Sequence, residues 1–240
     1  MKIGVIGLGT IATAVVRGIA QDGHQITVSK RSAQHATALT AAYDCVTVAE
    51  NQQVLDQSDV IFLGLMAGAA PDILNSLKFR SGQRVISFMA DVSLAEVAVM
   101  VAPATASAIM MPFPGIATGG TPIMMLGDAA LVGSIFGARN TLYPLRDDAE
   151  LQAYICAQAV LSPVAQMVSG VANWAAEKGA DRAQSEAFLR QLIASSLAAS
   201  DSDSLVQALS TPGGYNLRLR EHMQVSGLEE ALKRGLDDLA

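Results

Sequence analysis

The residues with the clearest chemical potential lie near the N-terminus, in the segment Gly7-Leu8-Gly9-Thr10-Ile11-Ala12, which follows an apolar run. Gly7 allows a tight strand-to-helix turn, Gly9 lets a phosphate approach the backbone, and Ala12 lets the helix pack closely against the strand. The first amides of such a helix and its positive end attract anions. The pattern therefore predicts a pyrophosphate-binding turn, and a glycine turn without a ligand is the alternative.

A second group of candidate ligand residues follows the next expected strand, about 20 residues after the glycine turn. It reads Val28-Ser29-Lys30-Arg31-Ser32, with two cations between two hydroxyls and no acid in reach. A site for a free ribose places Asp or Glu here, whereas a 2′-phosphate needs positive charge and several donors. We therefore expect NADP(H) rather than NAD(H), and a solvated basic turn is the alternative.

These residues must be positioned by short strands that alternate with helices. Branched apolar runs predict strands at 2–7, 25–29, 60–65, 84–88, 106–110, 121–125 and 141–145. Helix-length segments lie at 11–21, 32–42, 69–77, 93–101 and 129–136. Strands that are apolar on both faces and alternate with helices predict an α/β fold, a Rossmann-type, doubly wound and mainly parallel sheet.

The character of the chain changes after residue 146. Residues 147–240 contain no strand-like run and predict helices at about 148–160, 163–178, 181–199, 202–209, 215–224 and 227–239. Asp181 is the expected N-cap of one helix, and Gly179 is expected to end the helix before it. We expect two domains, a nucleotide-binding domain at 1–146 and an all-α domain at 147–240. So small a helical domain buries little core alone, so its long helices are expected to form a homodimer, with Trp174 buried between them.

The composition excludes several classes of function. The chain has 16 basic and 22 acidic residues, a net charge of −6, which argues against a nucleic-acid partner. Two cysteines without metal-type spacing predict no metal site and no disulfide framework, and a reducing cytoplasm is expected. Residues 97–127 carry no charge, but four prolines interrupt them, which predicts buried strands and loops rather than a membrane helix.

Beyond these motifs, the chain resembles the pyrroline-5-carboxylate reductase family along nearly its whole length. The glycine turn and the segment Ser29–Arg31 match the start of the family's pattern, and Asn51 matches an asparagine that lies by the adenosine phosphate. Ser210-Thr211-Pro212-Gly213-Gly214 resembles the family's Ser/Thr-Pro-Gly-Gly loop, which is the most specific shared feature. The chain departs from the family at Met66 and Phe113, and at Tyr215 and Asn216, where the family has two small residues, the second a threonine.

The resemblance implies an NADPH-dependent reductase that transfers a hydride from nicotinamide C4 to the carbon of a cyclic imine carboxylate. Pyrroline-5-carboxylate, reduced to L-proline in proline biosynthesis, is the first candidate substrate. In the family the Pro-Gly-Gly loop comes from the partner subunit and faces the nicotinamide, so its amides are expected to bind the substrate carboxylate.

The resemblance and the motifs together assign two sets of residues. The cofactor-binding set is Gly7, Gly9, Thr10, Ile11, Ala12, Ser29, Lys30, Arg31, Asn51, Leu65, Met66, Met89 and Pro112. The substrate-binding set is Ser210, Thr211, Gly213, Gly214 and Asn216, and Asn216 is also the candidate catalytic donor beside the imine nitrogen. His24, His35 and His222 are expected at the surface, without a catalytic role.

Three other functions remain open from the sequence. A β-hydroxyacid dehydrogenase shares the Rossmann start and the helical tail, but it needs a lysine base within the first long helix of the tail. The lysines of the tail are Lys178, at a helix end, and Lys233, in the last helix, so the expected base is missing. A deazaflavin:NADP reductase is a second alternative. A protein that binds NADP and regulates without turnover is the third, because the family's residues are replaced at several positions.

Overall fold

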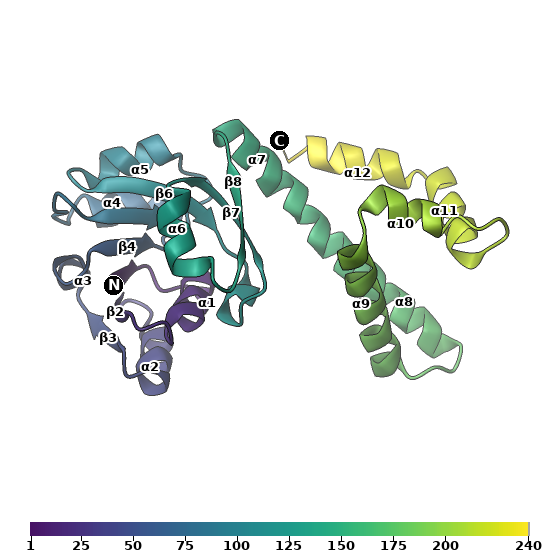
Figure 1. Cartoon of the computed structure of the whole chain (residues 1–240), viewed down its shortest axis with the longest axis horizontal. Helices are drawn as coiled ribbons and strands as arrows, with labels where there is room; N and C mark the ends of the chain where they lie inside the picture. The colour runs from purple at the N-terminus through teal and green to yellow at the C-terminus, as the bar shows by residue number, and fades with distance from the viewer. Residues whose placement is uncertain (240) are drawn as a thin grey trace. The chain divides into compact units, whose positions relative to one another are not determined.

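The structure is a computed structural model that describes residues 1–239, and it divides into two compact units, Met1–Gln152 and the chain from Ala153 onward (Figure 1). The first unit is built on one eight-stranded sheet with the order β3-β2-β1-β4-β5-β6-β7-β8. The strands are β1 (Lys2–Ile6), β2 (Gln25–Ser29), β3 (Val46–Ala49), β4 (Val60–Leu63), β5 (Arg84–Ser87), β6 (Thr105–Met111), β7 (Pro122–Gly127) and β8 (Thr141–Leu145). All neighbours pair in parallel except β6 and β7, which are antiparallel.

Helices cover both faces of this sheet. The buried side chains of α1 (Thr10–Ile19), α2 (Ala33–Ala42) and α6 (Ala129–Phe136) join one apolar cluster. Those of α3 (Asn51–Asp56), α4 (Ala70–Leu74) and α5 (Leu94–Val101) join a second cluster on the opposite face. The short 3₁₀ turns η1 (Ala67–Ala69) and η2 (Pro114–Ala117) follow β4 and β6. The expected mainly parallel, doubly wound α/β sheet is therefore confirmed.

The sheet centre is packed by aromatic rings. The ring of Phe62 on β4 lies 5.4 Å from that of Phe88 and 5.8 Å from that of Phe136, measured between centroids. Tilted rings at these distances bury large apolar areas in favourable geometry. Since β4 is apolar on both faces and fully buried, the uninterrupted run Val60–Leu63 belongs in the middle of a covered parallel sheet.

Two elements of the first unit are absent from the sequence-based expectations. The edge strand β3 has four residues and α3 has six, and both lie between residues 46 and 56. The uncharged segment 97–127 forms the end of α5, then β6, η2 and β7, so its assignment to strands and loops is confirmed.

The second unit is entirely helical within the residues that the structure describes. Its elements are the end of α7 (Asp148–Ala157), the turn η3 (Gln158–Val160), α8 (Leu161–Glu177), α9 (Arg182–Ala199), α10 (Ser202–Ala208), α11 (Tyr215–Val225) and α12 (Leu228–Asp237). The N-cap is confirmed, because the Asp181 carboxylate accepts a hydrogen bond of 2.7 Å from the Gln184 amide. Gly179 ends α8 with φ at +93°, which also matches expectation. The units divide after Gln152, inside α7, later than the boundary expected at residue 146.

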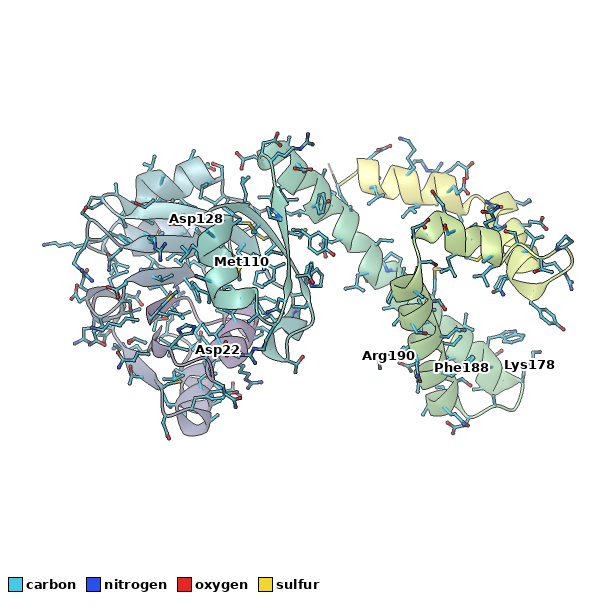
Figure 2. All side chains as sticks on the ribbon, viewed as in Figure 1. Asp22, Met110, Asp128, Lys178, Phe188 and Arg190 are labelled. Carbon is cyan, nitrogen blue, oxygen red and sulfur yellow. The ribbon has the colours of Figure 1, made fainter. Side chains whose placement is uncertain are left out.

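The long helices α8 and α9 leave much apolar surface uncovered. Trp174 is 60% exposed and Phe188 is 62% exposed, so the expectation that Trp174 is buried between the helices is wrong for a single chain. The Lys178 ammonium instead lies 5.9 Å from the Trp174 ring centroid. Phe188 and Lys178 are labelled in Figure 2.

By length and composition alone, the 30-residue helical run Asp148–Glu177 could cross a membrane, and the same properties fit a helix that packs on protein.

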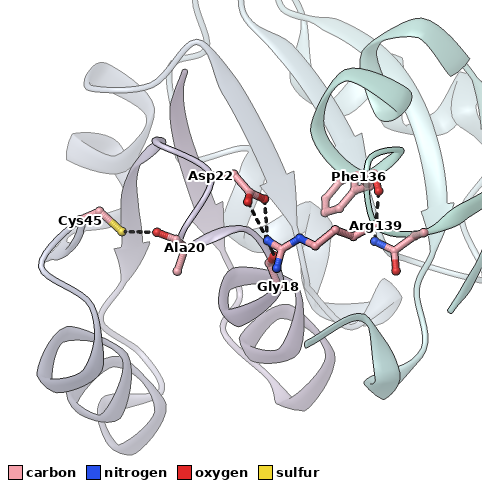
Figure 3. Close-up of polar contacts among 7 residues, drawn as sticks. Gly18, Ala20, Asp22, Cys45, Phe136 and Arg139 are labelled. Atoms are coloured by element: carbon pink, nitrogen blue, oxygen red, sulfur yellow. Dashed lines mark hydrogen bonds and ion pairs between the residues drawn. The ribbon is translucent and has the colours of Figure 1, made fainter. Parts of the chain in front are cut away.

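Arg139, in the loop between α6 and β8, connects that loop to the end of α1 (Figure 3). Its guanidinium donates to the Gly18 carbonyl and to both carboxylate oxygens of Asp22, at 2.7 and 2.8 Å. A cation at a helix C-terminus satisfies carbonyls that lack helical partners and interacts favourably with the helix dipole. Arg139 therefore stabilises the position of the helix that begins at the glycine turn.

We predict that Arg139→Gln lowers the free energy of unfolding by about 1 kcal/mol, because it removes a partly exposed ion pair and a helix-end hydrogen bond. Thermal unfolding followed by circular dichroism measures the change. Arg84→Gln is the matched control, since Arg84 forms no ion pair within residues 1–239. Equal melting temperatures for the two variants would contradict this role of Arg139.

Candidate functional site

The candidate site lies where the order of the strands reverses, between β1 and β4. In open α/β sheets, ligands bind at this switch point, outside the carboxyl ends of the strands. Gly7 follows β1 with φ at +86°, a conformation that favours glycine. A Cβ on Gly7 would lie 2.5 Å from the Gly64 carbonyl oxygen, and one on Gly64 would lie 2.4 Å from the Gly7 oxygen. The turns after β1 and β4 therefore touch, backbone against backbone.

The next glycine is open to solvent. A Cβ on Gly9 would meet no atom within 4 Å, so the space above it can accept a ligand. Gly9 is the N-cap of α1, and no side chain accepts a hydrogen bond from the first amides of that helix. These amides, including those of Thr10 and Ile11, are free to bind an anion. Ala12 is buried, and a larger side chain there would press on Gly64.

Ser29, at the end of β2, supports the glycine turn from inside the protein. The side chain is fully buried, and its hydroxyl oxygen accepts a 3.1 Å hydrogen bond from the Gly7 amide. The sequence suggested that this hydroxyl would bind a phosphate, and the structure places it beneath the turn instead. Ser29 therefore fixes the turn, while the residues after it face the solvent.

The charged residues beside the end of β2 include one from the end of β3 that the sequence did not indicate. Lys30 and Arg31 are exposed, as expected. However, the Lys30 ammonium forms an ion pair with the carboxylate of Glu50, which follows β3. The expectation that no acid lies in reach is therefore wrong, because it considered only the residues adjacent in sequence. Within residues 1–239, Arg31 forms no ion pair.

The remaining expected cofactor residues follow parallel strands and so lie along the same edge of the sheet. Leu65 and Met66 follow β4, Met89 follows β5, and Pro112 follows β6. Met89 and Pro112 are buried, Leu65 is half-buried, and Met66 is 81% exposed. Asn51 is the first residue of α3, directly after Glu50.

In the second unit, the loop Ser210–Gly214 connects α10 to α11. Gly213 has φ at +75°, and the Gly214 amide donates to the Thr211 carbonyl at 2.9 Å, so the loop is a defined turn. Gly214 is the N-cap of α11, and no side chain caps this helix. Asn216 is exposed in its first turn, and Tyr215 is 88% exposed. The arrangement leaves helix amides available for an anion.

Arg220 holds this loop from α11. Its guanidinium donates to the Ser210 hydroxyl at 2.8 Å and to the Val206 carbonyl at 3.2 Å. The Ser210 hydroxyl itself donates to the Val206 carbonyl at 2.6 Å, so its proton is already in a hydrogen bond. The structure therefore shows Arg220 as a support of the loop.

No group of three or more His, Cys, Asp or Glu residues within 1–239 could hold a metal ion. What the described residues offer is a turn and a helix end for anions, two cations beside them, and an apolar sheet edge. Such a site can bind a phosphorylated ligand and exclude water from one side of it.

The first unit of the chain resembles a described protein family. Residues 2–91 match the family described as NADP oxidoreductase coenzyme F420-dependent. This match supports the interpretation of the protein as an oxidoreductase. No curated protein matches the sequence.

The solved structures that resemble this chain include three informative examples. Pyrroline-5-carboxylate reductase from Streptococcus pyogenes has a TM-score of 0.83 and 19% identity, covering 100% of this chain and 98% of that chain. Pyrroline carboxylate reductase from Plasmodium falciparum, solved with NADP bound, has a TM-score of 0.85 and 16% identity, covering 100% of this chain and 95% of that chain. Imine reductase from Pseudomonas sp. has a TM-score of 0.65 and 20% identity, covering 99% of this chain and 87% of that chain.

The sheet order, the glycine turn at the switch point and the helical second unit define a Rossmann-type α/β protein with a helical C-terminal unit. More particularly, the chain has the fold of the pyrroline-5-carboxylate reductases, so the family resemblance of the sequence is confirmed at the level of the fold.

The two glycines that face the switch point predict opposite effects of an added methyl group. We expect Gly9→Ala to fold with an unchanged melting temperature and to lose NADPH binding, because the methyl group occupies open space above the turn. Gly64→Ala should destabilise the protein by about 1–3 kcal/mol, because its methyl group overlaps the Gly7 oxygen. Thermal unfolding and NADPH fluorescence titration measure both effects. Unchanged NADPH affinity in Gly9→Ala would exclude this turn as the phosphate site.

Proposed function

We propose that this protein is an NADPH-dependent reductase of a small cyclic imine that carries a carboxylate, with pyrroline-5-carboxylate as the first candidate substrate and L-proline as its product. The observation that carries the proposal is the open turn at Gly9, which lies at the switch point of a fold shared with pyrroline-5-carboxylate reductases. The second support is the Pro-Gly-Gly turn at the start of α11.

The cofactor proposed for this site is NADP(H). The amides of Thr10 and Ile11 hold the pyrophosphate above Gly9, and Arg31, which forms no ion pair within residues 1–239, binds the 2′-phosphate together with Lys30. The other proposed cofactor contacts are Gly7, Ala12, Asn51, Leu65, Met66, Met89 and Pro112, whereas Ser29 holds the turn from beneath. Structural relatives solved with NADP or with NADPH bound support this choice.

The chemistry demands little of the protein, because the bound nicotinamide supplies the hydride. The chain has to place the imine carbon against nicotinamide C4 and exclude water. A protonated imine is already electrophilic, so a strong catalytic base is not needed. No histidine is assigned as such a base, and in the structure His24 and His35 are half-buried and His222 is exposed.

The substrate carboxylate is proposed to bind the loop of the second unit. The uncapped amides at the start of α11 and the residues Ser210, Thr211, Gly213 and Gly214 provide the donors, with Arg220 fixing the loop. The Asn216 side chain is the proposed hydrogen-bond partner of the imine nitrogen, and its amide oxygen can accept a hydrogen bond from the N–H of the protonated imine. Tyr215 adds bulk beside Asn216. If pyrroline-5-carboxylate proves inactive, this bulk favours a substrate of a different shape.

The assembly proposed is a cytoplasmic homodimer formed through the C-terminal helices. The exposed apolar residues of α8 and α9 are the support, because apolar patches of this kind mark interfaces. Packing on a second copy also accounts for the apolar character of the run Asp148–Glu177 without a membrane. No nucleic acid is expected as a partner, given the net charge of −6.

We predict that the purified protein oxidises NADPH when pyrroline-5-carboxylate is added, measured as the loss of NADPH absorbance, with NADH in parallel. A panel of other cyclic imines follows if that substrate is inactive. Oxidation by none of the imines, together with NADPH binding, would contradict the reductase and favour a protein that binds NADP without turnover.

A deazaflavin:NADP reductase is the second candidate, because the family matched by residues 2–91 is described as F420-dependent. Reduction of coenzyme F420 by NADPH, measured in the same assay without an imine, would favour this candidate. The β-hydroxyacid dehydrogenase has less support, since Lys178 lies at the exposed end of α8 beside Trp174 rather than within a helix.

We further predict a mass of at least twice 25.0 kDa by sedimentation velocity at micromolar concentration. Phe188→Glu should shift the protein toward the monomer, because it places a charge in the proposed apolar interface. The matched control is Val99→Glu on α5, an exposed apolar residue of the first unit. A monomeric wild-type protein would contradict the proposed dimer.

A further inference from the structure

The pairing of β3 with β2 brings an acid to the expected 2′-phosphate site. In the parallel register, Ser29 lies opposite Ala49, so the residues that follow them, Lys30 and Glu50, leave the sheet side by side. Their side chains form an ion pair and remain 62% and 57% exposed. The carboxylate therefore lies at the rim where the adenosine ribose would bind, and a ligand can reach it.

The backbone of Glu50 is held in this position by α3. Glu50 is the N-cap of that helix and forms a capping box with Gln53, whose side-chain oxygen accepts a hydrogen bond of 3.3 Å from the Glu50 amide. The two strands and the capped helix fix where the carboxylate can lie. The ion pair therefore follows from the backbone positions of Lys30 and Glu50 rather than from a chance contact of two long side chains.

Charge and hydrogen bonding at this rim favour different ribose groups. Lys30, Arg31 and Glu50 sum to one positive charge, whereas a bound 2′-phosphate monoester brings between one and two negative charges. Glu50 repels that phosphate and competes for Lys30. A carboxylate also accepts hydrogen bonds from the two hydroxyls of an unphosphorylated ribose, the role that an acid after the second strand has in NAD sites.

We propose that Glu50 is a specificity-determining residue of the cofactor site, which weakens the preference for NADPH over NADH. The proposal rests on the proposed function, in that it assumes that the ribose lies beside Lys30 and Arg31. It follows that the wild-type protein binds both cofactors with a modest preference for NADPH, and that the preference depends on the ion pair.

The test compares the dissociation constants of NADPH and NADH, measured by fluorescence titration, for the wild type and three variants. Glu50→Gln keeps an oxygen that can cap α3 and removes the charge, and it should raise the preference for NADPH about five- to tenfold, the effect of one charge near a partly exposed phosphate. Arg31→Gln should lower NADPH affinity with little effect on NADH. Asp56→Asn removes the same charge at the other end of α3 and should leave the preference unchanged.

The outcomes distinguish a failure of the role proposed for Glu50 from a failure of the proposed function. An unchanged preference in Glu50→Gln, a shift toward NADH, or an equal effect of Asp56→Asn overturns the role of Glu50 while dinucleotide binding still supports the proposed function. If the wild type binds neither cofactor, the proposed function itself fails. A melting temperature equal to the wild type's confirms that Glu50→Gln leaves α3 folded.

Discussion

The close approach of the Gly7 and Gly64 backbones is the constraint on which the candidate site depends. It lets the carboxyl ends of β1 and β4 meet where the strand order reverses, and the buried Ser29 hydroxyl then fixes the Gly7 amide from below. The site is shaped by main chain at its base, with side chains only around the rim. A site of this kind tolerates extensive substitution, which fits a fold shared with reductases at 16–19% identity.

Most of the fold could be predicted because each signal is local. Apolar runs and turn residues located the strands of the sheet apart from β3, and the Asp181 cap and the Gly179 helix end follow from chemistry within four residues. The strand β3 and helix α3 were missed because four and six residues are too few for periodicity to register. Glu50 was missed for a related reason, since its contact with Lys30 depends on the pairing of two strands 20 residues apart.

The side chains of the second unit were harder to predict, because their environment depends on what packs against them. Trp174 belongs by type in a protein interior, yet two antiparallel helices cover only part of so large a ring. The role of Arg220 was not predicted, because the sequence does not show that α11 folds back on the end of α10. In both cases the residue type indicated what kind of contact the side chain could make, but the sequence did not show which residues would surround it.

The uncapped start of α1 has a consequence for stability. The helices α5, α6, α9 and α10 each begin with a side chain that accepts a hydrogen bond from an amide of the first turn, whereas α1 begins at Gly9 without one. A bound pyrophosphate would supply the missing acceptor, so the ligand becomes in effect the N-cap of the first helix. Part of its binding free energy is then spent on completing that helix, so ligand binding would stabilise the first βα unit.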